Sequence, residues 1–185
     1  MKTPRFTVAV FCGSRLGTRP EYLEAARGLG AAIGKQGGGL VYGGARIGLM
    51  GALADAALAA GAPVHGVLPK GLAAREIAHE SLTRLDIVDS LHERKARMVE
   101  LAQGFIAMPG GFGTLDEFFE VYTWRQIGLH DKPLGLLDTE GFFTPLLAFM
   151  HQSVQEGFVP ASHLALLQTG AQPEALVERM FPPAG

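Results

Sequence analysis

Short apolar runs alternate along this chain with longer stretches that carry apolar residues at helical spacing. The short runs predict strands over Thr7–Cys12, Leu40–Tyr42, Val64–Leu68, Leu85–Val88, Phe105–Met108 and Leu134–Leu137. The longer stretches predict helices over Glu21–Gln36, Leu49–Ala60, Leu91–Gln103, Leu115–Ile127, Phe142–Glu156 and Pro173–Met180. A last apolar run, Leu164–Leu167, is expected to add an edge strand.

Strands that are nearly all apolar and that alternate with helices predict a parallel sheet covered on both faces. The expected fold is therefore α/β, a Rossmann-like, doubly wound parallel sheet. No linker or repeat divides the chain, so we expect a single nucleotide-binding domain over residues 1–185. Ligands of such sheets bind at the carboxyl ends of the strands, where the strand order reverses.

Composition narrows the class of protein. Hydrophobic residues make up 48% of the chain, yet no apolar run reaches the roughly 20 residues of a membrane span. The net charge of −2 gives no reason to expect a nucleic acid or a membrane surface as partner. Cys12 is the single cysteine, so one chain forms neither a disulfide nor a thiolate metal site. Residues 1–5 lack the apolar segment of a secretory signal, and we expect a cytoplasmic protein.

The most specific motif is the segment Pro109–Glu117, which lies between a predicted strand and a predicted helix. Its three glycines allow the backbone to approach a ligand, and the first N–H groups of the helix carry partial positive charge. Such a turn is typical of an anion site, most often for a phosphate. Glu117, one turn into the helix, either caps that helix or acts on the bound ligand.

Two other strand-to-helix turns are candidate binding loops. Ser14 follows the first strand and either binds a phosphate or simply caps a turn. The glycine-rich segment Tyr42–Gly51 does not match G-x-G-x-x-G, and no acidic residue ends the following strand. The sequence therefore gives only weak evidence for a dinucleotide site.

A basic segment, Leu91–Met98, begins the third predicted helix. Its ordinary interpretation is a solvated basic face, and the functional one is that Arg94 turns inward to grip an anion. No nucleophile–base or metal-binding motif occurs in the chain. An anion cradle with arginines and carboxylates suits the cleavage of a bond that breaks towards a cation, such as an N-glycosidic bond.

The segments Pro109–Glu117 and Leu91–Met98 together match PGGxGTxxE and an HxRKAxM-like pattern. With them, nearly the whole chain resembles the LONELY GUY family, the cytokinin riboside 5′-monophosphate phosphoribohydrolases. The resemblance implies hydrolysis of a nucleoside 5′-monophosphate to free base and ribose 5-phosphate, without metal or redox cofactor. It also implies a homodimer with sites near the interface. Such sequences are also called possible lysine decarboxylases, but no pyridoxal-phosphate lysine site is recognisable here.

The resemblance also assigns residues. Arg94 and Glu117 match the catalytic pair of the family. The positions that match substrate-binding residues are Ser14, Gly43, Gly44, Glu76, Lys95, Gly110, Gly111, Phe112, Gly113, Thr114, Leu115, Asp116 and Thr123. The departures are small: Leu91, Asp116 and Ala45 stand where the family often has Met, Glu and Gly.

Three other functions remain open at this point. A general AMP or purine monophosphate nucleosidase differs only in the pocket for the base, which the sequence does not place. A non-catalytic nucleotide-binding module, such as a sensor or a carrier, would not need Arg94 and Glu117. A dinucleotide oxidoreductase is disfavoured by the glycine spacing and by the missing ribose-binding acid.

Overall fold

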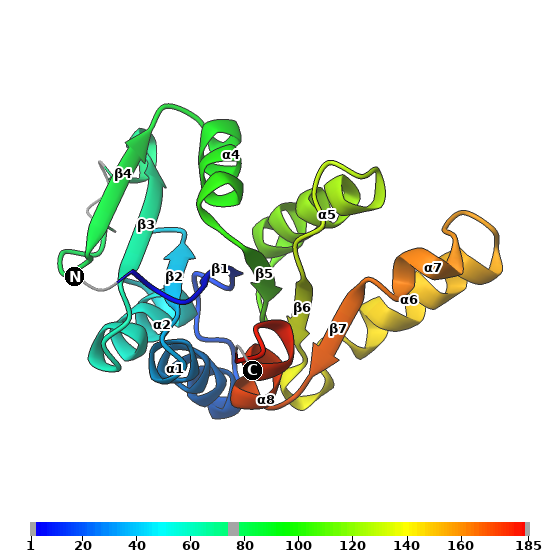
Figure 1. Cartoon of the computed structure of the whole chain (residues 1–185), viewed down its shortest axis with the longest axis horizontal. Coiled ribbons are helices and arrows are strands. Elements are labelled where there is room, and N and C mark those ends of the chain that lie inside the picture. Colours follow the sequence, from blue (N-terminus) through cyan, green and yellow to red (C-terminus); the bar gives the residue numbers. More distant parts are fainter. Residues whose placement is uncertain (1–2, 74–77, 184–185) are drawn as a thin grey trace.

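The computed structural model describes residues 3–73 and 78–183, and the strands within these ranges form one parallel sheet. The seven strands follow the order β4-β3-β2-β1-β5-β6-β7 (Figure 1). Their bounds are β1 Thr7–Phe11, β2 Gly39–Tyr42, β3 Val64–Pro69, β4 Arg84–Val88, β5 Gly104–Ala107, β6 Leu134–Leu137 and β7 Leu167–Gly170. The predicted α/β class with a parallel sheet is confirmed.

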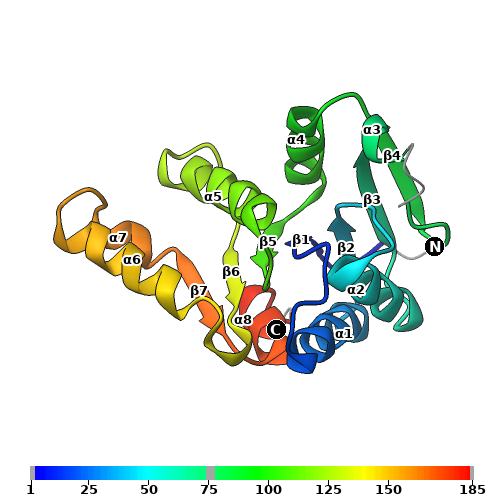
Figure 2. The same ribbon diagram turned by 180° about the vertical axis from the view of Figure 1, so that it is seen from behind.

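Helices cover both faces of this sheet, as the two opposite views show (Figure 1, Figure 2). Their bounds are α1 Pro20–Lys35, α2 Gly48–Ala59, α3 Lys70–Ala73, α4 Leu91–Leu101, α5 Phe112–Gln126, α6 Thr144–Gln155, α7 Ala161–Leu164 and α8 Pro173–Met180, with a 3-10 turn at Thr139–Gly141. Helices α1, α2 and α8 bury their apolar sides in one core, and α4, α5 and α6 contribute to the other. No helix in the described part of the chain is long and apolar enough to cross a membrane.

The six predicted helices and the first six predicted strands are observed with small shifts of their ends. The expected edge strand is observed as β7, but the predicted bounds Leu164–Leu167 are wrong, because helix α7 ends at Leu164 and β7 begins at Leu167. An apolar run of four residues fits a strand or one helical turn equally well, and here its leucines pack into the core from both. The short helix α3 was not expected.

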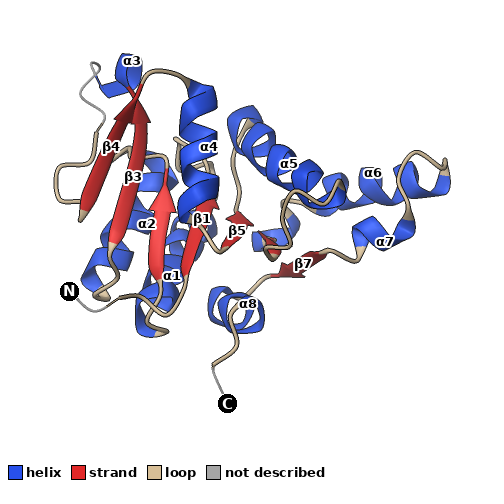
Figure 3. Cartoon of the chain, turned by 45° about the horizontal axis from the view of Figure 1, so that its top comes forward, coloured by secondary structure: helices blue, strands red, loops and turns tan. Residues whose placement is uncertain are grey.

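Strand β4 differs from the other strands because it is polar. It lies at the edge of the sheet, where it pairs only with β3 in the described structure (Figure 3). None of its five residues is buried, and it carries Arg84 and Asp86. An edge strand faces solvent on one side, and charged residues there discourage pairing with another chain.

The strand order reverses between β1 and β5, which pair with each other but lead to helices on opposite faces of the sheet. The two loops that follow them are joined by a hydrogen bond from the Gly13 N–H to the Pro109 carbonyl, at 3.1 Å. This is the switch point at which ligands of doubly wound sheets bind. The fold therefore places the loops of Ser14 and Gly110–Gly113 at one end of the sheet.

Candidate active site

Helix α5 begins in the glycine-rich turn and leaves its N-terminus open. Gly111 occupies the N-cap position, no side chain caps the helix, and its first turn contains no acidic residue. The first N–H groups of a helix have no partner within the helix, so here they are available to a ligand. They border a cavity of about 510 Å³ that is lined by Gly111, Phe112, Gly113 and Thr114. The arrangement can bind an anion.

Arg94 and Glu117 form an ion pair in the same cavity. Arg94 Nη1 lies 2.9 Å from Glu117 Oε1, and the two side chains are only 13% and 11% exposed. Oε1 is buried without a well-aligned hydrogen bond, so the contact is electrostatic and the carboxylate keeps free lone pairs. Arg94 also donates from Nε to the Val67 carbonyl of β3, at 3.1 Å. The guanidinium thus lies inward and is held from two sides.

Gly43, at the end of β2, makes room for this arrangement. A Cβ at Gly43 would overlap the Arg94 guanidinium and lie 3.0 Å from the Met50 sulfur. Only glycine therefore lets the guanidinium lie against the backbone at this point. Gly43 therefore has a structural reason to be part of the site, because it leaves space for Arg94. This reason differs from contact with a phosphate.

Burial raises the pKa of the Glu117 carboxyl, and the nearby positive charge of Arg94 opposes this shift without cancelling it. Glu117 therefore keeps a proton to higher pH than an exposed glutamate does. A carboxylate in this environment can accept a proton from water or stabilise a developing positive charge. Burial also raises the pKa of the Cys12 thiol, so that the thiol is neutral and a poor nucleophile.

The rest of the cavity wall is largely apolar. Its members come from the ends of β1 and β3 and from the start of α2, and they are Val10, Cys12, Ala45, Ile47, Met50 and Leu68. Sequence reasoning singled out none of them as site residues, because isolated apolar residues after a strand look like core residues. An apolar wall opposite charged groups is suited to a ligand with one charged end and one flat or apolar end.

The second glycine-rich turn, between β2 and α2, does not offer a comparable anion site. The Leu49 N–H, in the first turn of α2, donates to the Gly13 carbonyl at 3.1 Å. Gly48 has a positive φ of 62° and lies against the backbone of Ser14 and Arg15. This turn therefore supports the loop of Ser14, and the chain itself occupies the helix N-terminus.

Lys95 points away from the cavity. Its ammonium lies 3.1 Å from Asp116 Oδ2 and 2.9 Å from Glu120 Oε2, both on α5. Adjacent residues of a helix point about 100° apart, so Arg94 and Lys95 contact different neighbours. Asp116 is therefore paired with Lys95, and Thr123 is exposed on the surface of α5.

The structure brings part of the predicted site together. The predicted residues that line the cavity are Ser14, Gly43, Arg94, Gly111, Phe112, Gly113, Thr114 and Glu117. Gly110 lines a neighbouring pocket of about 310 Å³ with Ser14, Tyr22 and Phe142. The predicted residues outside the cavity lining are Gly44, Lys95, Leu115, Asp116 and Thr123. Glu76 falls outside the described residues. Across residues 3–73 and 78–183, no group of three His, Cys, Asp or Glu side chains is placed to hold a metal ion.

Comparison with solved structures shows that proteins with a different named function share this fold. A molybdenum cofactor carrier protein from Chlamydomonas reinhardtii superposes with a TM-score of 0.72 at 21% identity, covering 98% of this chain and 100% of the other. A molybdenum cofactor binding protein from Rippkaea orientalis gives the same TM-score and identity over 97% and 96%. At this identity the likeness concerns the fold alone.

Comparison of sequences is more specific. The family described as "Possible lysine decarboxylase" matches residues 50–180. The cytokinin riboside 5′-monophosphate phosphoribohydrolase of Rhodococcoides fascians is 49% identical, over 85% of this chain and 79% of its own length. A protein of the same name from Arabidopsis thaliana is 42% identical, over 94% and 81%. The chain therefore belongs to the family of cytokinin riboside 5′-monophosphate phosphoribohydrolases.

Proposed function

We propose that the protein hydrolyses the N-glycosidic bond of adenosine 5′-monophosphates, with N6-substituted (cytokinin) nucleotides as substrates, and releases the free base and ribose 5-phosphate. One observation carries the proposal: the buried Arg94–Glu117 pair lies in the same cavity as the uncapped N-terminus of α5. An anion site next to a carboxylate is what cleavage of a sugar phosphate requires. The names of relatives at 42–49% identity support it.

The N–H groups at the start of α5 bind the 5′-phosphate, together with Thr114 and the Ser14 hydroxyl at the cavity edge. Arg94 orients the sugar phosphate beside Glu117. Cleavage develops positive charge on the ribose, which the Glu117 carboxylate stabilises electrostatically. As the N-glycosidic bond breaks, the departing base takes up a proton from solvent, and Glu117 accepts a proton from the water that attacks the anomeric carbon. The apolar wall around Met50 and Leu68 receives the base.

The fold does not distinguish a hydrolase from a carrier, since it is shared with molybdenum cofactor carrier proteins. The Arg94–Glu117 pair favours a hydrolase, because it places a buried carboxylate in the cavity beside the anion site. Such a carboxylate disfavours the binding of an anion and is retained where it acts on the ligand.

Glu117→Gln tests the proposal. The variant removes the charge and the proton acceptor, and we expect kcat to fall by at least about 10³-fold while AMP still binds. Chromatography of free adenine measures the reaction, and calorimetry measures AMP binding. Glu120→Gln is the matched control, because Glu120 lies on the same helix and contacts Lys95 outside the cavity. Release of adenine by Glu117→Gln at the wild-type rate would remove Glu117 from the mechanism.

The preference for the base needs a separate measurement. We expect kcat/KM to be higher for N6-isopentenyl-AMP than for AMP, because the cavity wall around Val10, Met50 and Leu68 is apolar. Equal values for the two nucleotides would favour a general purine monophosphate nucleosidase instead.

We also propose that the 185 residues act as one domain and pair into a homodimer. Phe112 at the cavity edge, Phe149 on α6 and Phe158 after it are 94%, 64% and 84% exposed. Large exposed apolar side chains are typical of protein interfaces. Light scattering measures the oligomeric state, and a monomer at micromolar concentration would contradict the proposal. The cytoplasmic location stays a prediction from the sequence.

A further inference from the structure

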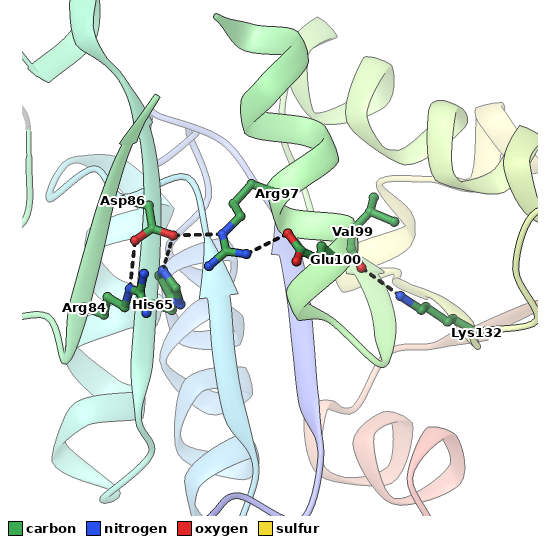
Figure 4. Close-up of polar contacts among 7 residues, drawn as sticks. All are labelled: His65, Arg84, Asp86, Arg97, Val99, Glu100 and Lys132. Carbon is green, nitrogen blue, oxygen red and sulfur yellow. Dashed lines mark hydrogen bonds and ion pairs between the residues drawn. The ribbon is translucent and has the colours of Figure 1, made fainter. Parts of the chain in front are cut away.

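Helix α4, which carries Arg94, packs on the core through Met98, Val99 and Leu101 and is otherwise attached by charged side chains. Within Leu91–Leu101, all of which the structure describes, only Met98 is buried. Arg94 binds β3, Lys95 binds α5, and Arg97 binds β4. At the C-terminal end of the helix, Lys132 Nζ donates to the Val99 carbonyl at 2.7 Å. Figure 4 shows the contacts of Arg97 and Val99.

Asp86 on β4 makes the contact that holds Arg97 in place. Its Oδ2 lies 2.9 Å from Arg97 Nε and 3.0 Å from His65 Nε2, and its Oδ1 lies 2.8 Å from Arg84 Nε (Figure 4). Burial alone would raise the pKa of the Asp86 carboxyl, but the hydrogen bonds from Arg97 and Arg84 outweigh it and lower the pKa to about 2. Asp86 is therefore charged under all ordinary conditions.

Few other contacts join β4 to α4 near the Asp86–Arg97 ion pair. An open groove of about 570 Å³ runs between them, and Asp86 and Arg97 are among its lining residues. The ion pair spans this groove, with side chains that are 18% and 28% exposed. The apolar contacts of α4, at Met98, Val99 and Leu101, are with the core and do not fill this groove. Loss of the ion pair therefore allows the helix to shift on the side that faces β4.

A shift of α4 would also move Arg94. Arg97 follows Arg94 by three residues, so the two side chains leave neighbouring positions on the same side of α4. The contact of 2.9 Å between Arg94 and Glu117 spans two helices. A displacement of about 1 Å in a group that takes part in chemistry can reduce a rate by as much as about 100-fold.

We propose that the Asp86–Arg97 ion pair positions Arg94 opposite Glu117 and thereby sets the rate of the chemical step. Asp86 and Arg97 are then positioning residues for a reaction whose substrate they do not contact. This inference rests on the proposed function. It separates the two halves of the site, because the phosphate is held by α5 and Arg94 is placed by α4.

Asp86→Asn and Arg97→Gln test the proposal by steady-state kinetics with a nucleoside monophosphate. We expect kcat to fall about tenfold in each variant and KM to rise by clearly less than that, because Arg94 loses its alignment with Glu117 while the phosphate donors of α5 are untouched. The double variant should lose no more than either single one, since both remove the same contact. Arg97→Lys keeps the charge and should recover part of kcat.

Arg84→Gln is the matched control. Arg84 contacts the same carboxylate, but it lies on β4 with Asp86 and does not reach α4. It should leave kcat within about twofold of the wild type. An equal loss of kcat in Arg84→Gln, or unchanged kcat in both Asp86→Asn and Arg97→Gln, would overturn the proposal.

A crystal structure of Arg97→Gln gives a test that does not depend on activity. We expect the distance from Arg94 Nη1 to Glu117 Oε1 to grow beyond about 4 Å, where an ion pair is lost. An unchanged distance would refute the positioning role even if no nucleotide were hydrolysed. A wild-type protein that releases no base would refute the proposed function. The distance in Arg97→Gln would still test the positioning role of the Asp86–Arg97 ion pair.

Discussion

Helices α4 and α5 each follow a strand and each carry one member of the Arg94–Glu117 pair, but their N-termini differ. At α4, Ser90 Oγ accepts from the Glu93 N–H at 3.1 Å, and Glu93 Oε2 accepts from the Asp89 N–H at 2.8 Å. At α5, Gly111 is the N-cap and no side chain caps the helix. Because the first N–H groups of every helix need acceptors, α4 supplies its own and α5 leaves them to a ligand.

The two helices contribute different groups to the candidate site. Helix α5 provides backbone donors and Glu117, and its first turn contains no acidic residue that would repel an anion. Helix α4 has Glu93 in its first turn and provides only a side chain, Arg94, from farther along. Helices α1, α2, α6, α7 and α8 also lack a side-chain cap. The uncapped end of α5 is therefore informative because it borders the cavity that contains Arg94 and Glu117.

The largest effect is expected from placing a charge at the open end of α5. Gly113 has no atom within 4 Å of an added Cβ, so Gly113→Asp fits without steric conflict. Its carboxylate repels the phosphate, and we expect KM to rise about 100-fold or more. The same charge favours the helix N-terminus and should raise the free energy of unfolding by about 0.5 kcal/mol.

Kinetics and denaturant unfolding of Gly113→Asp measure these opposite changes. Gly113→Asn is the control, because it has nearly the same size without the charge. If the two variants showed the same KM, charge at this helix end would not govern binding.

A smaller effect concerns pH. In the proposed mechanism ionised Glu117 is the active form, so kcat/KM should fall as the pH decreases through its pKa, which burial raises above the usual value of a glutamate. Arg94 holds this pKa down, so Arg94→Gln should move the acid limb to higher pH. The pH profile of kcat/KM measures both. An acid limb that stays in place, or moves to lower pH, would contradict the assigned coupling.

The smallest effect on activity is expected at the capped end. Ser90→Ala removes the acceptor of the Glu93 N–H and should lower the free energy of unfolding by about 1 kcal/mol. KM should change less than about twofold, because α4 contributes no backbone donors to the cavity. Urea unfolding and kinetics measure these changes, with Ser90→Thr as the control that keeps a cap. A rise in KM as large as that of Gly113→Asp would remove the distinction between the two helices.

Much of the fold was predictable because its signals are local. The alternation of apolar runs and helical patterns placed every strand of the sheet except β7. The apolar run Leu164–Leu167 was misassigned because neighbours distant in sequence decide whether four apolar residues bend or extend. The polar residues of β4 became intelligible only from its position at the edge of the sheet.

The candidate site was predictable in part. The motif Pro109–Glu117 indicated the anion site from glycine content and position alone. Sequence reasoning also proposed the glycine-rich turn before α2 as a weaker candidate loop, but its Leu49 N–H already donates to the Gly13 carbonyl. Likewise, no rule of spacing indicated that Lys95 contacts Asp116 and Glu120 on α5.

The sequence by itself determined the fold class, the glycine-rich turn after β5 and the residue types of the site, because each depends on short-range pattern and backbone freedom. Only the tertiary structure decided that Arg94 lies 2.9 Å from Glu117, over Gly43, and that Asp86 anchors its helix through Arg97. These contacts join residues far apart in the chain, and they depend on how the sheet aligns its strands and on how the helices pack against it.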